Sequence, residues 1–139
     1  MRTIYSASLL LLLLFPFVAL KAQDTSNVRG ARIEFKEKVK DYGDILYGDS
    51  VNYSFQITNT GKENLVISAV KTTCICTTVD FPTEAIAPGQ SAELKVTFQS
   101  AKQEGTGRQR KTISVVSNGV NNYEQAVLIV NIQKKSLKK

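Results

Sequence analysis

The chain has 139 residues, of which 18 are Lys or Arg and 12 are Asp or Glu, and it contains no His and no Trp. The absence of His excludes Ser-His-Asp and Cys-His catalytic machinery and any imidazole-ligated metal site. The only Met is the initiator, which also excludes a thioether copper site. No group of Cys, Tyr, Lys or carboxylate residues stands out as a reaction centre. We therefore expect a protein that is not an enzyme and binds no cofactor.

The first 22 residues are typical of a secretory signal peptide. Arg2 gives a positively charged start, residues 7–20 form an uncharged and mostly apolar run, and the small residue Ala22 provides a cleavage position. The run is shorter than the roughly 20 apolar residues of a membrane-spanning helix, and no Cys near the junction is available for lipid attachment. These features predict export to the periplasm or the outside, with no membrane span.

Removing these 22 residues leaves 117, enough for one domain with one hydrophobic core. We expect a flexible leader over residues 23–30, a single domain over residues 31–132 and a Lys-rich tail over residues 133–139. Six of the 18 basic residues lie in the signal segment or the last six positions, which leaves 12 basic against 12 acidic residues between them. The balanced domain argues against a nucleic-acid partner. The expected partner is another envelope or secreted protein.

Apolar residues recur with a period of two along the domain, which predicts strands. Ile33 and Phe35 mark a leading strand, and charged residues of both signs then alternate over residues 34–49, as is typical of a solvated edge. Alternation is unbroken over residues 51–57 and 92–98, and residues 65–70 form a short apolar strand. The β-branched runs at 113–116 and 126–132 suit strands that are buried on both faces. The expected inward-facing set is Val51, Tyr53, Phe55, Ile57, Leu94, Val96 and Phe98.

Turn signals separate these strands. Asn59-Thr60-Gly61-Lys62 is predicted to turn with Gly61 at positive φ, Pro88-Gly89 and Asn118-Gly119 mark further turns, and residues 103–110 are predicted to form a polar loop. Short strands with turns between them indicate an all-β fold. The prediction is an Ig-like antiparallel β-sandwich of about seven strands with Greek-key connections.

Cys74-Ile75-Cys76 is the one pair that could carry chemistry. In an oxidising compartment two thiols are usually bonded, metal-bound or buried. Residues two positions apart in a strand lie on one side, about 6.5 Å apart, whereas a disulfide needs Cβ atoms about 3.5–4.5 Å apart. A regular strand would leave the thiols free, and a bend would allow a strained bridge that is easily reduced.

Three interpretations of Cys74 and Cys76 stay open. They are a structural bridge or two small side chains at a sheet edge, a thiol–disulfide site, or part of a soft-metal site whose other ligands would be carboxylates or a second chain. A bridge that closes about three residues contributes on the order of 1.5 kcal/mol through unfolded-state entropy. Replacing both residues with Ser is therefore expected to cost only about 1–2 kcal/mol.

Other residues give weaker signals. Tyr42, Tyr47 and Tyr53 could line a binding surface, although aromatic residues of a small sandwich favour core or corner positions. Asn52-Tyr53-Ser54 matches the N-glycosylation sequon inside a predicted strand, and Asp49-Ser50-Val51 matches a bacterial O-glycosylation pattern. Both patterns are three residues long and occur often by chance.

Several motifs follow one another in a characteristic order. They are Phe35…Tyr42-Gly43-Asp44-Ile45…Gly48, Phe55-Gln56-Ile57-Thr58-Asn59-Thr60-Gly61, Leu65 with Ile67, Cys74-Ile75-Cys76-Thr77, Ile86-Ala87-Pro88-Gly89, Val96-Thr97-Phe98 and Ser117-Asn118. Over about residues 31–132 this combination resembles the bacterial domain of unknown function 1573, an exported Ig-like sandwich related to hydin-type Ig domains. The resemblance implies fold and export and no established activity. Family members typically have Gly between the two Cys, so Ile75 is expected to hinder disulfide closure.

These observations support two hypotheses about function. The first is an exported, non-enzymatic Ig-like module that contacts another protein or supports envelope architecture through its edge strands and loops. The alternative is a periplasmic protein that handles thiols, disulfides or a soft metal through Cys74 and Cys76.

Overall fold

The computed structural model describes residues 29–134. The predicted signal peptide, residues 23–28 of the leader and residues 135–139 of the tail lie outside the described residues. The regular elements are β1 (Ile33–Phe35), β2 (Val39–Leu46), β3 (Ser50–Asn59), β4 (Ile67–Thr72), β5 (Thr77–Asp80), β6 (Ser91–Gln99), the 3₁₀ turn η1 (Ser100–Lys102), β7 (Gly107–Ser117) and β8 (Tyr123–Gln133).

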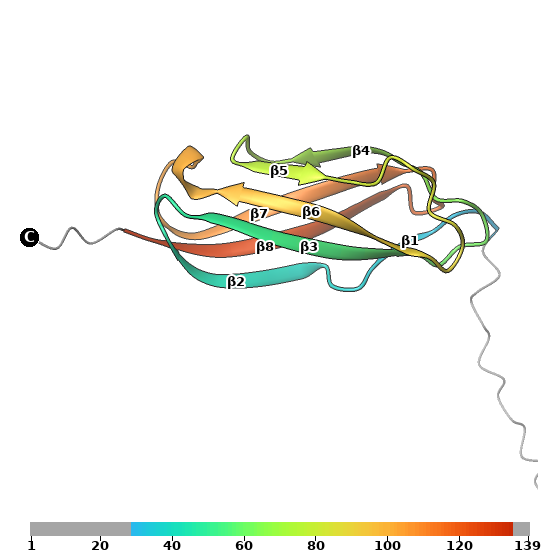
Figure 1. The fold of residues 1–139 in the computed structure, drawn as a ribbon, viewed down its shortest axis with the longest axis horizontal. Helices are drawn as coiled ribbons and strands as arrows, with labels where there is room; N and C mark the ends of the chain where they lie inside the picture. Colours follow the sequence, from blue (N-terminus) through green and yellow to red (C-terminus); the bar gives the residue numbers. More distant parts are fainter. Residues whose placement is uncertain (1–28, 135–139) are drawn as a thin grey trace, which may run out of the picture.

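These strands form two packed sheets, with the orders β1-β3-β6-β5 and β2-β8-β7-β4 (Figure 1). The predicted all-β, Ig-like sandwich is confirmed. It contains eight strands where about seven were expected, and the pairing of β2 with β8 is parallel whereas every other pair is antiparallel. Strand β2 was not predicted. Ile45 is its only buried residue, so its sequence lacks the alternation of apolar and polar residues from which strands are predicted.

The core lies between the two sheets, and the predicted inward-facing residues of β3 and β6 supply its centre. Six of the seven are at most 1 % exposed. Tyr53 is the exception: its ring packs edge-on against Phe55 with centroids 4.8 Å apart, while its hydroxyl donates a 2.7 Å hydrogen bond to Glu37 at the surface. This bond to the Glu37 carboxylate raises the pKa of Tyr53. Tyr53 therefore closes the rim of the core.

Strands β7 and β8 differ from the prediction that both of their faces are buried. On β8, Ala126, Leu128, Val130 and Ile132 belong to the core, whereas Ile129 and Asn131 between them are partly exposed. The alternation on β7 is similar, with Ile113 and Val115 buried and their neighbours half-buried. The β-branched run misled the prediction because β-branched residues also suit the open face of a strand. Only one face of this sheet is packed against the other sheet.

The turn after β3 is organised by Asn59, a polar residue with no exposed surface. Its Nδ2 donates to the carbonyls of Glu63 (2.7 Å) and Ile86 (2.8 Å), and its Oδ1 accepts from the main-chain N–H groups of Gly61 (3.0 Å) and Arg32 (3.3 Å). Asn59 thereby joins three segments that are distant in sequence. All of its polar atoms are satisfied, as burial requires.

Gly61 is needed for a different reason than expected. Its φ is not positive, which contradicts the prediction from the turn motif. A Cβ at this position would lie 2.6 Å from the carbonyl carbon of Ala31, so Gly61 allows the chain before β1 to approach the turn closely. The Pro88-Gly89 turn is present as predicted, and it is Gly89 that has a positive φ, of 77°.

Candidate functional site

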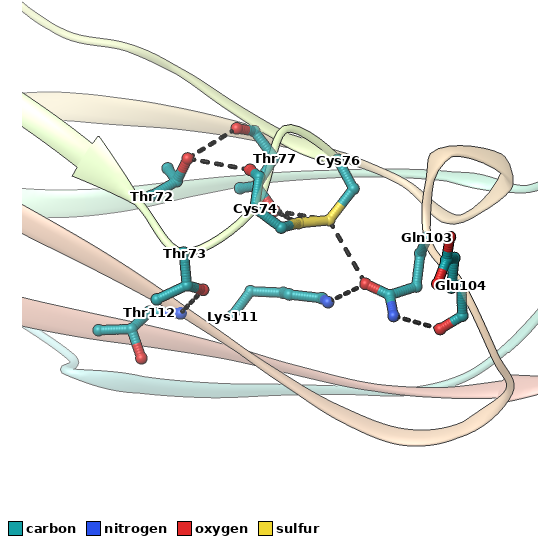
Figure 2. The surroundings of a disulfide bond; sticks show 9 residues. All are labelled: Thr72, Thr73, Cys74, Cys76, Thr77, Gln103, Glu104, Lys111 and Thr112. Carbon is teal, nitrogen blue, oxygen red and sulfur yellow. Dashed lines mark hydrogen bonds between the residues drawn. A yellow bond between two sulfur atoms is a disulfide. The ribbon is translucent and has the colours of Figure 1, made fainter.

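The two cysteines lie in a tight turn where the chain passes from β4 in one sheet to β5 in the other. Their Cα atoms are 5.2 Å apart and the two residues form a disulfide. The chain therefore takes the bent conformation of the two considered, and the thiols are not free. Thr72 supports the bend, since its hydroxyl lies 3.1 Å from the carbonyl oxygens of both Cys74 and Thr77 (Figure 2).

Ile75 does not prevent disulfide closure, contrary to expectation. No residue other than Gly has positive φ in the described part of the chain, so the turn needs no conformation that an Ile would resist. Ile75 is 87 % exposed. The disulfide therefore carries an apolar side chain at its outer end.

The two sulfurs differ in their surroundings. Cys76 is 2 % exposed and belongs to the core, whereas Cys74 is half-buried and packs against it. The Thr77 hydroxyl lies 3.7 Å from Cys74 Sγ and 3.8 Å from Cys76 Sγ. Cys74 is thus the sulfur that a molecule approaching from solvent reaches more easily.

Two polar side chains lie under the buried sulfur (Figure 2). Gln103 Oε1 is 3.6 Å from Cys76 Sγ, a contact that is no hydrogen bond because a disulfide sulfur carries no proton. The same Oε1 accepts a hydrogen bond from Lys111 Nζ, while Gln103 Nε2 donates to the Glu104 carbonyl at 2.5 Å. One amide oxygen therefore links the lysine amine to the disulfide.

Lys111 occupies a position that usually belongs to an apolar residue. It faces inward from β7, is 5 % exposed, and places Nζ 5.3 Å from the centre of the Phe98 ring. Neither salt bridge found in residues 29–134 includes it. Burial lowers the pKa of Lys111, because a cation loses hydration inside the protein. Sequence analysis missed Lys111 and Gln103, although Lys111 falls in phase with Ile113 and Val115.

A soft-metal site at Cys74 and Cys76 would need further ligands from carboxylates or a second chain. Within residues 29–134, no group of three or more His, Cys, Asp or Glu side chains is placed to hold an ion. The two sulfurs are bonded to each other rather than available as thiolates. The same residues contain no helix with the length and apolarity to cross a membrane.

The two outer surfaces of the sandwich differ in their apolar content. Strands β3 and β6 present Asn52, Ser54, Gln56, Glu93, Lys95 and Thr97 outward. The outward positions of β2, β8 and β7 combine polar residues, among them Arg110, Ser114 and Gln125, with apolar ones. These apolar side chains are here called the contact face: Val39, Leu46, Val116, Tyr123, Val127 and Ile129. Val127 is 5 % exposed yet does not belong to the core, so its neighbours on the contact face cover it.

The remaining predicted residues lie at the surface. Tyr42 and Tyr47 are 45 % and 43 % exposed, so neither has the core position that was one expectation for them, whereas Tyr47 does lie at the corner between β2 and β3. Tyr42 lies on β2, and Tyr47 lies in the turn that follows it. Asn52 is exposed on β3, where its Oδ1 accepts a 2.8 Å hydrogen bond from Thr97, and Ser50 is exposed at the start of the same strand.

Solved structures with the same fold include bacterial and human proteins. A protein of unknown function from Porphyromonas gingivalis W83 matches with a TM-score of 0.66 and 19 % identity, and the match covers 78 % of this chain and 51 % of that one. The ASH / PapD-like domain 7 of human CEP192 matches with a TM-score of 0.63 and 9 % identity, over 86 % and 97 % of the two chains. The E. coli chaperone DraB matches with a TM-score of 0.55 and 10 % identity, over 81 % and 60 %.

At these identities the likeness establishes the fold. The chain spans about half the length of the P. gingivalis protein. No curated protein matches the sequence significantly. The sequence profile of one family matches residues 33–132, which cover the sandwich from the first residue of β1 almost to the end of β8. The chain therefore belongs to the family described as Protein of unknown function (DUF1573).

Proposed function

We propose that this protein is an exported, non-enzymatic module that binds another envelope or secreted protein through its contact face. The observation that carries the proposal is the difference between the two outer surfaces. A sheet that faces water on one side normally alternates apolar and polar residues, as β3 and β6 do. The contact face departs from that rule, and exposed apolar patches bordered by polar residues mark protein-binding sites.

The charges around the contact face indicate the chemistry of the partner. Asp41 is paired with Arg108 at 2.7 Å, and Asp44 accepts a 2.6 Å hydrogen bond from Asn131. Arg110 and Lys71, which point outward from β7 and β4, have no salt-bridge partner among residues 29–134. A partner that presents apolar side chains flanked by carboxylates would complement this face. The neighbour DraB is described as a chaperone, a class of protein that acts by contacting other proteins.

Export gives the first expected result. The protein recovered from cells should begin at Gln23, because Ala22 offers the small residue that signal peptidase requires and the apolar run before it is short. N-terminal sequencing or intact-mass measurement of protein from the periplasmic fraction and the medium tests this. A chain that starts at Met1, or one that stays with carbonate-washed membranes, would contradict export by cleavage.

The contact face gives the second expected result. A photo-crosslinking amino acid at Val39 should produce an adduct with a different protein in living cells, whereas the same group at Ser54 on the polar face should not. Adding Arg110→Glu should reduce the yield several-fold through like-charge repulsion, and the matched change Lys95→Glu on the polar face should leave it unaltered.

Three outcomes would overturn the proposed contact. These are equal yields at both positions, a yield at Val39 that does not respond to Arg110→Glu, and an adduct of twice the mass of the chain. The last would identify a second copy as the occupant of the face.

A further inference from the structure

The corner between β4 and β5 holds a disulfide, an amide and a buried lysine side by side, and a purely structural disulfide would not need the other two. A bridge between residues two positions apart restrains little of the unfolded chain, so it adds little stability. Yet its buried sulfur lies against an amide oxygen that also binds a buried lysine amine. Burying a cation without a carboxylate partner is unfavourable. A state of the corner that places an anion beside Lys111 would relieve this cost.

Reduction produces that state. Once the bridge opens, Cys76 becomes a thiol or thiolate that faces Gln103 and, through it, Lys111. A thiolate there is an anion beside a cation that otherwise has none, and a nearby positive charge lowers the pKa of a thiol. Burial of Cys76 by itself raises the pKa of its thiol, so Lys111 is the group that favours the thiolate, while Gln103 Oε1 can accept a hydrogen bond from the protonated form.

The charged groups around the pair are few. The turn itself contributes only the hydroxyls of Thr72, Thr73 and Thr77, and β6 contributes the Phe98 ring and the Gln99 N–H, which donates to the Cys76 carbonyl at 2.8 Å. The loop after η1 contributes Gln103 and the main-chain carbonyl of Glu104, whose side chain is exposed. Among the residues around the pair, Lys111 is the cation that faces inward.

We propose that Cys74–Cys76 is a thiol–disulfide exchange site in which a dithiol attacks the half-buried Cys74, Cys76 leaves as a thiolate, and Lys111 acts as a positioning residue for that thiolate. The first thiolate of the dithiol bonds to Cys74 Sγ as the Cys74–Cys76 bond breaks. Its second thiolate then attacks its own sulfur in the mixed disulfide and releases Cys74. The dithiol ends as a disulfide that has given up two electrons, and the protein gains two thiols that take their protons from water.

The exposed Ile75 side chain fits this role. It lies beside the sulfur that is attacked and gives an incoming dithiol protein an apolar contact next to the reacting bond. The site lies at the β4–β5 corner and does not depend on the contact face, so either can fail without the other.

The test measures the thiol pKa of Cys76 directly. In a Cys74→Ala background, the ultraviolet absorbance of the thiolate is followed against pH with Lys111, with Lys111→Met and with Lys111→Arg. We expect Lys111→Met to raise the pKa of Cys76 by about one unit and Lys111→Arg to restore it. Lys71→Met serves as the matched control, because Lys71 lies on the opposite face of the same sheet and is exposed.

The same substitutions are then made with both cysteines present and equilibrated with dithiothreitol. Above both thiol pKa values, Lys111→Met should lower the equilibrium constant for reduction about tenfold, and the difference should fade as the pH falls below them, because less thiolate then forms. An unchanged Cys76 pKa in Lys111→Met would overturn the proposal.

The stability of the double variant Cys74→Ala/Cys76→Ala provides an independent measurement. The exchange site predicts a folded protein whose denaturation midpoint lies close to that of the wild type. A double variant that fails to fold would show that the bridge is a structural staple, and the proposal would be wrong.

Discussion

Replacing Phe98 with alanine is expected to lower the free energy of unfolding by about 3–5 kcal/mol. Phe98 has no exposed surface and lies on β6 between Val51 of β3 and Thr77 of β5. Truncation loses the burial of the ring and leaves a cavity that neighbours on three strands cannot all fill. It also removes the aromatic face 5.3 Å from Lys111 Nζ. Urea denaturation followed by circular dichroism measures the loss.

Phe81→Ala is the matched control for this prediction. Phe81 is half-buried and packs against the margin of the core, so that the same change of side chain should cost clearly less. Equal losses in the two variants would show that Phe98 does not lie at the centre of the core, and an unchanged midpoint for Phe98→Ala would refute its placement.

Removing the side chain of Asn59 is expected to cost about 2–4 kcal/mol, the second largest effect. Asn59→Ala removes the acceptor of the Gly61 N–H and one of the two donors to the Ile86 carbonyl, which keeps its 2.9 Å bond from the Leu65 N–H. Buried polar groups that lose their partners pay their full desolvation penalty. The turn itself has no other side chain that spans these three segments. Urea denaturation again provides the measurement.

Asn59→Asp separates hydrogen bonding from shape, because the two side chains have nearly the same volume. At neutral pH the carboxylate would face two carbonyl oxygens that now accept from Nδ2. The pKa of the new Asp should therefore lie above its unfolded value, so its penalty is present at neutral pH and shrinks as the pH falls through the folded pKa. Relative to wild type, the variant should recover stability in acid. A penalty that does not vary with pH would contradict the hydrogen-bonding role.

The central strands were predictable from the sequence, because a strand buried on one face has an apolar residue at every second position. Val51, Phe55 and Leu94 follow that pattern and lie where it places them. Strand β2 was not predictable, since it is held by backbone pairing to β8 and has one buried side chain. The role of Gly61 could not be predicted either, because it depends on how closely residues 30–32 approach the turn in the folded domain.

The candidate site was only half predictable, for a similar reason. The Cys-Ile-Cys spacing signals a small ring, and it correctly left a bent conformation open. Which conformation forms depends on Thr72 and on the passage of the chain between sheets. Lys111 comes from a strand 35 residues further on, and nothing in the local sequence relates it to Cys76. Contacts of that kind follow from topology.

The pairing of β2 with β8 has a consequence for the newly made chain. A polypeptide is synthesised from its N-terminus at about 5–20 residues per second, and the only neighbour of β2 in its sheet is the last strand to be made. The N-terminal segment likewise meets Asn121, 88 residues after Ile33. For on the order of 10 s, β2 therefore has unpaired backbone groups on both sides and leaves Ile45, which is buried in the folded domain, uncovered. Such an edge is prone to aggregate, and the arrival of the C-terminal hairpin ends that interval.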